Sequence, residues 1–156
     1  MEKIKILLVD DEKEFVETLS ERIRMRDHNS EVALDGEQAL KKIDSEIPDV
    51  VVLDLKMPGI DGMEVLRRIR KAYPKVQVIM LTGHGSDKDE KEARKLGVFD
   101  YLQKPVDMET LMKKIKSAYK KKFEMGMAAA AFAEGGDFDS ARDILKEEDQ
   151  EDKEQK

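Results

Sequence analysis

The strongest constraint on the fold is an alternation of short apolar runs with segments of helical periodicity. The runs are rich in Val, Ile and Leu and occupy residues 3–9, 31–34, 50–53, 76–81 and 99–102. Three of them are nearly continuous in apolar residues, as is typical of strands buried on both faces of a parallel sheet. Parallel strands need long crossover connections, which the intervening segments can provide. We therefore expect a parallel sheet with helical connections.

The segments between the runs have the apolar spacing of amphipathic helices. The residues that share a face are Phe15, Val16, Leu19 and Ile23 in the first, Ala39, Leu40 and Ile43 in the second, Leu66 and Ile69 in the third, and Leu111, Ile115, Ala118 and Tyr119 in the fifth. The fourth helix is expected to begin after Ser86 and to stop at Gly97, because Ser is a good N-cap and Gly a frequent helix end. Five strands interleaved with five helices predict a doubly wound α/β domain over residues 1–122.

Composition excludes several kinds of site. Because the 156-residue chain has no cysteine, disulfides, cysteine-based zinc sites, iron–sulfur clusters and thiol nucleophiles are ruled out. Only two histidines are present, which argues against a histidine-rich metal site. No apolar stretch reaches the roughly 18 residues that a membrane span needs, and the N-terminus does not resemble a signal peptide. We expect a cytoplasmic protein without membrane contact.

The net charge of -6 is distributed unevenly along the chain. Residues 1–122 carry 25 Lys/Arg and 24 Asp/Glu, a net of +1, whereas residues 123–156 carry 4 and 11, a net of -7. A basic run at residues 113–122, with six lysines, is most simply a solvated helix face. No DNA binding is expected, because a nucleic-acid binder would show a basic domain or arm.

Residues 123–156 are too few for a DNA-binding output domain and have a pattern of their own. A helix-forming run at 125–133, a turn at 134–137 and a second apolar face predict a helical hairpin over residues 123–146. The turn resembles that of a tetratricopeptide repeat, but a single repeat cannot bury its own face. The hairpin is expected to pack on the domain, to form a homodimer or, less favoured, to dock on a partner. Residues 147–156 contain no apolar residue and predict a charged, disordered tail.

Charged and hydroxyl side chains gather at the carboxyl ends of the expected strands. Asp10 and Asp11 follow the first run, Asp54 the third, Thr82 the fourth and Lys104 the fifth. These ends share one edge of a parallel sheet, where doubly wound domains bind ligands. Two unit charges about 4 Å apart repel by about 4 kcal/mol at an effective dielectric near 20, so clustered carboxylates need a cation. Oxygen ligands favour a divalent metal, and Mg²⁺ is the natural choice because it keeps waters and accepts phosphoryl oxygens.

In this order, the motifs resemble the receiver domain of two-component response regulators. The matching segments are ILLVDDE at 6–12, VVVLDLKMPGIDG at 50–62, MLTG at 80–83 and YLQKP at 101–105. The resemblance covers residues 1–122 and implies a flavodoxin-like fold with strand order 2-1-3-4-5. It also implies a phospho-accepting protein of a two-component system, which receives its phosphoryl group from a sensor histidine kinase or phosphotransfer protein. No enzyme activity is expected beyond self-phosphorylation from a phosphodonor and slow autodephosphorylation.

The resemblance implies a role for each residue of the phosphoryl site. Asp54 is the expected phosphoacceptor, and Thr82 and Lys104 are expected to contact the phosphoryl group. Thr82 and Tyr101 are the expected switch pair, with Tyr101 changing rotamer on activation. The peptide bond before Pro105 is expected to be cis, an isomer that costs little before proline.

A metal site and two tuning positions follow from the same resemblance. Asp11 and Asp54 are expected to bind Mg²⁺ directly, with the main-chain carbonyl of Lys56 as a third ligand and Asp10 acting mainly through bound water. Lys56 and His84 occupy the positions that tune phosphoryl lifetime in the family. His84 is explained equally well as an ordinary loop residue.

Three other functions share part of this pattern. A haloacid dehalogenase phosphatase needs a second Asp two residues after its nucleophile, where this chain has Lys56. A flavodoxin needs a hydroxyl- and glycine-rich loop after the first strand, where this chain has acidic residues 10–12. The remaining alternative is a non-DNA-binding adaptor or phosphorelay scaffold whose helical hairpin carries the interaction. We expect the signal to leave through the fourth helix, fifth strand and fifth helix, toward a protein target or a second copy.

Overall fold

A computed structural model of the protein describes residues 3–134, which form a five-stranded parallel sheet covered by helices. The strands are β1 (Lys5–Val9), β2 (Asn29–Ala33), β3 (Val50–Leu53), β4 (Gln77–Thr82) and β5 (Asp100–Gln103). The helices are α1 (Lys13–Arg24), α2 (Gly36–Ser45), α3 (Gly62–Ala72), α4 (Asp87–Lys95) and α5 (Met108–Glu134). The strand order is β2-β1-β3-β4-β5, and all four pairings are parallel. The predicted flavodoxin-like fold and its strand order are confirmed.

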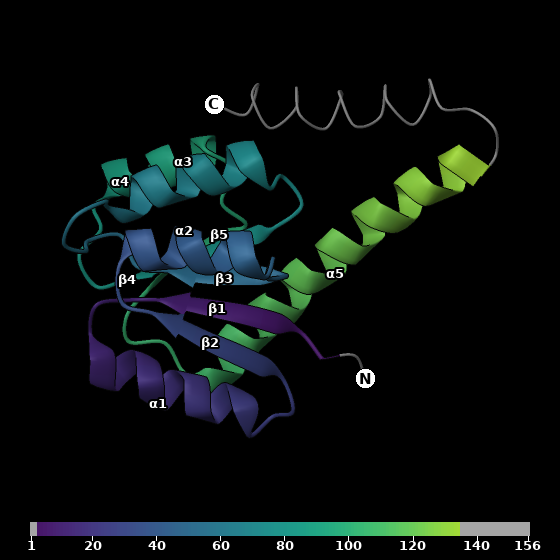
Figure 1. Ribbon diagram of the computed structural model, residues 1–156. Coiled ribbons are helices and arrows are strands. Elements are labelled where there is room, and N and C mark those ends of the chain that lie inside the picture. The colour runs from purple at the N-terminus through teal and green to yellow at the C-terminus, as the bar shows by residue number, and fades with distance from the viewer. Residues whose placement is uncertain (1–2, 135–156) are drawn as a thin grey trace.

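Both faces of the sheet are covered, which explains the continuous apolar runs. Figure 1 shows α2, α3 and α4 over one face and α1 and α5 over the other. Successive side chains of a strand point to opposite faces, so Leu7 and Val51 join the core beneath α2 to α4 while Leu8 and Val52 join the core beneath α1 and α5. Two hydrophobic cores therefore hold the central strands rigidly between them.

The register of the sheet fixes the positions of the residues that follow each strand. Val9 lies opposite Leu53 in the pairing of β1 with β3, and the Asp54 N–H donates to the Val9 carbonyl at 2.9 Å. Further along the same edge of the sheet, the Lys104 N–H donates to the Thr82 carbonyl at 3.0 Å. Backbone hydrogen bonds therefore set Asp54 beside the end of β1, and Lys104 beside the end of β4.

Helix α4 begins and ends as the sequence predicts. Ser86 is its N-cap, and the Ser86 hydroxyl and the Asp89 carboxylate form a reciprocal capping box. Gly97 follows the helix with φ of 91°, a left-handed conformation that glycine adopts without the Cβ penalty. The loop between β4 and α4 is thus anchored at the strand on one side and by the cap on the other.

Helix α5 is longer than predicted. It runs without interruption from Met108 to Glu134, so the boundary expected at residue 122 falls inside a helix and the first helix of the expected hairpin is a continuation of α5. The run is rich in Lys, Ala and Met, which favour helix, and Gly126 alone costs about 1 kcal/mol relative to Ala. The expected turn, second helix and charged tail, at residues 135–156, lie outside the described residues.

The basic run on α5 is only partly a solvated face. Lys114 pairs with Asp100 at 2.7 Å and Lys122 pairs with Asp49 at 2.6 Å. Both acids lie in the domain, so these lysines fasten α5 to the sheet. From residue 3 to residue 134, each helix is too short or too polar to cross a lipid bilayer.

Candidate functional site

Three carboxylates meet at the carboxyl edge of the central strands. Asp10, Asp11 and Asp54 each offer an oxygen, and these oxygens all lie within 4.8 Å of one another. Asp10 and Asp54 are 4% and 3% exposed, whereas Asp11 is exposed. The sequence placed these residues at strand ends, and the register of β1 with β3 brings them together.

The surroundings of Asp54 change the pKa of its carboxyl group. Burial, and after it the charge of Asp10, raises the pKa of Asp54 above its ordinary value. A hydrogen bond from Thr82, the charge of Lys104 and the Leu55 N–H, which donates to Asp54 Oδ1 at 2.8 Å, oppose the rise without cancelling it. The surroundings of Asp54 therefore disfavour its ionised form, and a cation among the three acids would oppose that preference.

The donor set suits a hard cation. All three side chains present carboxylate oxygens, which are the ligands that Mg²⁺ and Ca²⁺ prefer. Lys56, the expected carbonyl ligand, follows Asp54 by two residues in the loop between β3 and α3, and its side chain is exposed. Bonds from Ser86 lower the pKa of Asp89, and the Lys56 ammonium lowers it further, which places that ammonium near α4.

Lys104 lies next to the acid cluster and contacts other side chains there. Its Nζ atom is 2.6 Å from Asp10 Oδ2 and 3.6 Å from Glu12 Oε2, and it stands 4.4 Å from the centre of the Phe15 ring. Burial lowers the pKa of Lys104, but the hydrogen bond and charge of Asp10 outweigh it and raise that pKa. The Lys104–Pro105 peptide bond is cis, which is the isomer that the resemblance implies.

Glu12 and Phe15 were not singled out as site residues from the sequence. The sequence marks Phe15 only as an apolar residue in the first turn of the first helix, close after the acidic pair. For Glu12, the only signal was its place beside two acids. Both complete a cage of one aromatic ring and two carboxylates around the Lys104 ammonium.

Thr82 and Tyr101 lie behind Asp54, both buried. Thr82 has no exposed surface, its hydroxyl bonds to Asp54, and it accepts from the His84 N–H at 3.2 Å. Tyr101 is 6% exposed, and its hydroxyl finds no hydrogen-bond partner in the part of the chain that the structure describes. The His84 side chain is exposed. The structure therefore brings Thr82 and Tyr101 together and leaves His84 at the rim.

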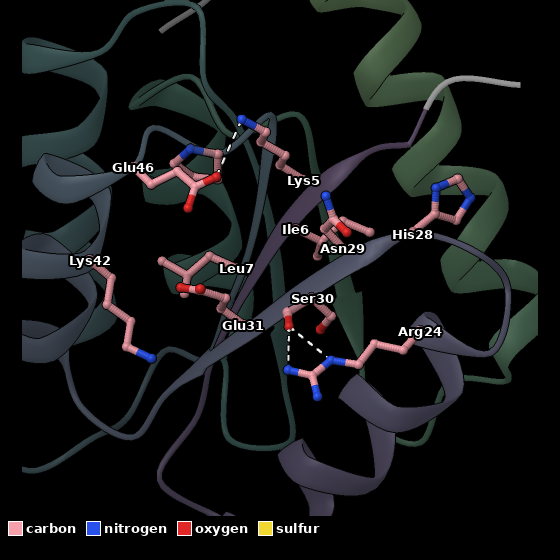
Figure 2. Close-up of a pocket in the computed structure, with 11 residues that line it drawn as sticks. Lys5, Ile6, Leu7, Arg24, His28, Asn29, Ser30, Glu31, Lys42 and Glu46 are labelled. Atoms are coloured by element: carbon pink, nitrogen blue, oxygen red, sulfur yellow. Dashed lines mark hydrogen bonds and ion pairs between the residues drawn. The ribbon is translucent and has the colours of Figure 1, made fainter.

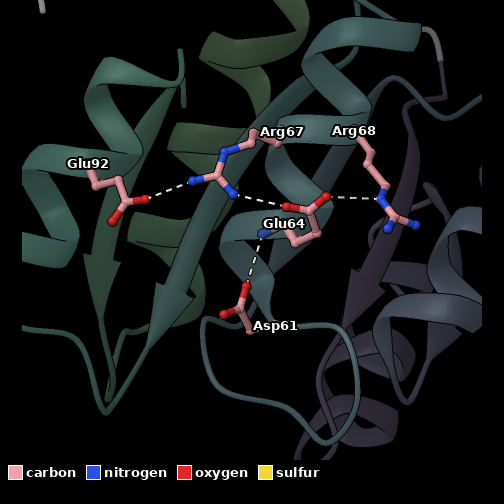
Figure 3. A network of polar contacts seen from close by, with 5 residues as sticks. All are labelled: Asp61, Glu64, Arg67, Arg68 and Glu92. Atoms are coloured by element: carbon pink, nitrogen blue, oxygen red, sulfur yellow. Dashed lines mark hydrogen bonds and ion pairs between the residues drawn. The ribbon is translucent and has the colours of Figure 1, made fainter.

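A polar network beside the cluster joins α3 to α4 (Figure 3). Glu64 accepts from Arg67 at 2.9 Å and from Arg68 at 3.1 Å, and Arg67 reaches Glu92 on α4 at 3.0 Å. The bonds from Arg67 and then Arg68 lower the pKa of Glu64. All of these side chains are well exposed, so solvent screens each pair and its contribution to stability is small. The network orients α4 next to the site more than it stabilises the fold.

A groove of about 370 Å³ lies away from the acid cluster, along the outer edge of β2 (Figure 2). Two cations cover the outward carbonyls of this edge strand. Arg24 donates two hydrogen bonds to the Ser30 carbonyl, at 2.8 and 3.1 Å, and Lys42 Nζ donates to the Val32 carbonyl at 2.6 Å. Covering an edge in this way blocks pairing with another strand. The cations along this groove therefore protect the outer edge of β2 from pairing with another strand.

Comparison with known proteins agrees with this geometry. The family model for the response regulator receiver domain matches residues 6–116. A CheY-like receiver domain protein from Methanospirillum hungatei superposes with a TM-score of 0.76 at 27% identity, covering 79% of this chain and 98% of that one. A receiver domain protein from Clostridium thermocellum gives a TM-score of 0.74 at 34% identity, covering 78% and 98%. NtrX from Brucella abortus gives 0.77 at 26% identity, covering 83% of this chain but 30% of that larger one.

Proposed function

The chain belongs to the response regulator receiver family of two-component systems, and from this premise we propose that it is a phospho-accepting switch with Asp54 as its phosphoacceptor. The observation that carries the proposal is the convergence on one buried carboxylate. Asp10 crowds Asp54 from β1, Thr82 bonds to it from β4, and Lys104 acts on it from the end of β5. An adaptor that had lost phosphoryl chemistry would have no need of this set.

Mg²⁺ fits the acid cluster and completes the proposed site. Asp10, Asp11 and Asp54 would hold it together with the Lys56 carbonyl, the first of them mainly through water. When bound, the metal would supply positive charge for the phosphoryl oxygens and lower the pKa of Asp54. The three neighbouring carboxylate oxygens support this role, and a cation among them would lower the raised pKa of Asp54.

The residues of the chain perform the transfer by position and charge. An Asp54 oxygen attacks phosphorus in line, the O–P bond forms as the N–P bond to the donor histidine breaks, and the departing imidazole keeps the electron pair and gains a proton from solvent. The equatorial oxygens carry the charge of the transition state. Lys104 would leave Asp10 to meet that charge, while the Thr82 hydroxyl donates to a phosphoryl oxygen in place of Asp54.

The proposed donor is a sensor histidine kinase or a phosphotransfer protein in the cytoplasm. The proposed output surface is α4, β5 and α5, because the Thr82–Tyr101 pair lies directly beneath it and a protein target or second copy could read its state there. The protein would turn over no other substrate, so its chemistry is limited to its own phosphorylation and dephosphorylation. The acidic balance of residues 123–156 opposes a DNA output.

Labelling with a small phosphodonor tests the proposal. Wild-type protein incubated with acetyl phosphate and Mg²⁺ should gain the mass of one phosphoryl group, measured on the intact chain, and EDTA should prevent it. Asp54→Asn should gain nothing, whereas Asp61→Asn, an exposed acid on the neighbouring loop, should label like wild type. Labelling of the Asp54→Asn protein would refute the assignment.

A further inference from the structure

Gly85 lies in the loop between β4 and α4, where its backbone faces the Tyr101 ring. A Cβ atom built at residue 85 would overlap the Tyr101 hydroxyl and lie 2.8 Å from Tyr101 Cζ. The same atom would lie 3.1 Å from Thr82 Cγ2. Tyr101 therefore occupies the space that a side chain at residue 85 would need, and Thr82 borders that space.

The need for glycine at this position is spatial. Positive φ angles occur at Gly59 and Gly97 among the described glycines, and Gly85 is not one of them. A positive φ is therefore not the reason for glycine at residue 85. The nearest atoms that a methyl group there would meet belong to Tyr101 and, next to it, to Thr82.

Tyr101 does not hold its buried position by hydrogen bonding. It is 6% exposed, yet its hydroxyl has no partner within residues 3–134. A buried hydroxyl without a partner is unfavourable, so packing and the room at Gly85 must keep the ring inside. If that room were filled, the ring would lose its packing and its hydroxyl would gain water by turning outward.

We propose that Gly85 is a positioning residue of the switch, because the missing side chain at residue 85 leaves the space that lets Tyr101 lie buried behind Thr82. A side chain at residue 85 turns Tyr101 outward and displaces the Thr82 methyl group. The consequence for ligand affinity at Asp54 rests on the proposed function, while the effect on Tyr101 stands on the geometry alone.

The two effects are linked through Thr82. Its hydroxyl bonds to Asp54, and its methyl group borders the space at Gly85. A phosphoryl-like ligand at Asp54 that favours the buried Tyr101 must bind more weakly when that state is less populated, in proportion to the fraction that remains. Gly85→Ala is therefore expected to weaken the binding of such a ligand, although residue 85 does not contact the ligand.

Tyrosine NMR tests the positioning directly. The chain has three tyrosines, so protein labelled with ¹³C at tyrosine Cζ gives resolvable signals that Tyr73→Phe and Tyr119→Phe assign. A soluble paramagnetic agent should broaden the Tyr101 signal in Gly85→Ala and spare it in wild type, while the other two signals report an intact fold. Gly83→Ala is the matched control for Tyr101, because a Cβ there meets only Lys104 atoms at 3.8 and 3.9 Å. A Tyr101 signal that stays protected in Gly85→Ala would overturn the proposal.

Binding of beryllofluoride, a phosphoryl mimic, with Mg²⁺ tests the linkage. Gly85→Ala should raise the dissociation constant by roughly threefold or more, and the same change in a Tyr101→Ala background should have a clearly smaller effect, which comes only through the Thr82 methyl group. An equal loss of affinity in both backgrounds would mean that the loop itself is distorted, which contradicts a role through Tyr101. If wild type bound no beryllofluoride, the proposed function would fail, and the NMR result would still decide the role of Gly85.

Discussion

Replacing Asp54 by Asn removes one of two nearly buried carboxylates and should stabilise the metal-free protein. The facing oxygens lie within 4.8 Å, and two unit charges at about that separation repel by about 3.5 kcal/mol at an effective dielectric near 20. Lys104, 2.6 Å from Asp10, offsets part of this. We expect a net gain of about 1–3 kcal/mol in the free energy of unfolding. The Asn side chain keeps the shape and the acceptor for the Leu55 N–H, so packing is preserved.

The stability gained by Asp54→Asn should depend on pH in a defined direction. Burial and the charge of Asp10 raise the pKa of folded Asp54 above 3.8. A raised pKa means that the folded state holds its proton longer than the unfolded chain does, so stability falls as pH rises through the window between the two values. The cost is absent well below pH 3.8 and grows as pH rises through that window. The gain from Asp54→Asn should therefore increase with pH and should disappear in acid.

Urea unfolding followed by circular dichroism, in EDTA and in Mg²⁺, measures the effect. Mg²⁺ should stabilise wild type more than Asp54→Asn, because a ligand that binds only the folded state adds to its stability. Asp35→Asn is the control, since Asp35 caps α2 and Asn caps equally well. If Asp54→Asn in EDTA at neutral pH were no more stable than wild type, the account of charge crowding would be wrong.

Three further predictions concern other parts of the molecule. Burial and then the charge of Lys116 lower the pKa of His28 below 6.5, so stability should fall as pH drops below about 6.5, and His28→Asn, which keeps an acceptor for a backbone N–H, should flatten that slope in urea titrations across pH. Tyr101→Phe removes a hydroxyl without a partner among the described residues, so it should leave the melting temperature unchanged or raise it. A loss of about 1 kcal/mol or more in the free energy of unfolding would reveal a hydrogen bond to that hydroxyl. Arg67→Ala and Glu92→Ala, measured singly and together, should give a coupling energy of about 1 kcal/mol or less because the pair is exposed; a larger value would show that the pair holds α4 to α3.

Much of the fold could be predicted because the strands are unambiguous. The run at 50–53 is wholly apolar and is buried along its whole length, and runs of this kind belong to sheets covered on both faces. Once the sheet is parallel, Asp10 and Asp54 must meet at one edge, so the acid cluster follows from strand order alone. The position of Lys104 follows less directly, because its contacts with Asp10, Glu12 and Phe15 are tertiary.

The remaining features depend on tertiary packing, which local sequence patterns do not determine. The change of charge near residue 122 indicated a boundary, but helix propensity continues through it, and α5 runs on to Glu134. The cage of Phe15 and Glu12 around Lys104 joins segments some ninety residues apart in sequence, and its side-chain directions are set only in the folded state. In the sequence Gly85 is one of several loop glycines, whereas in the fold the Tyr101 hydroxyl occupies the place where its Cβ would lie.

Chemical trapping of the phosphoryl group tests the central claim most directly. Borohydride reduces an acyl phosphate to the alcohol, so an aspartyl phosphate becomes homoserine at the position that carried it. After treatment with acetyl phosphate and Mg²⁺, followed by borohydride, peptide mass spectrometry should find homoserine at residue 54. Homoserine at Asp10 or Asp11 instead, or none in protein that had gained a phosphoryl group, would contradict Asp54 as the acceptor.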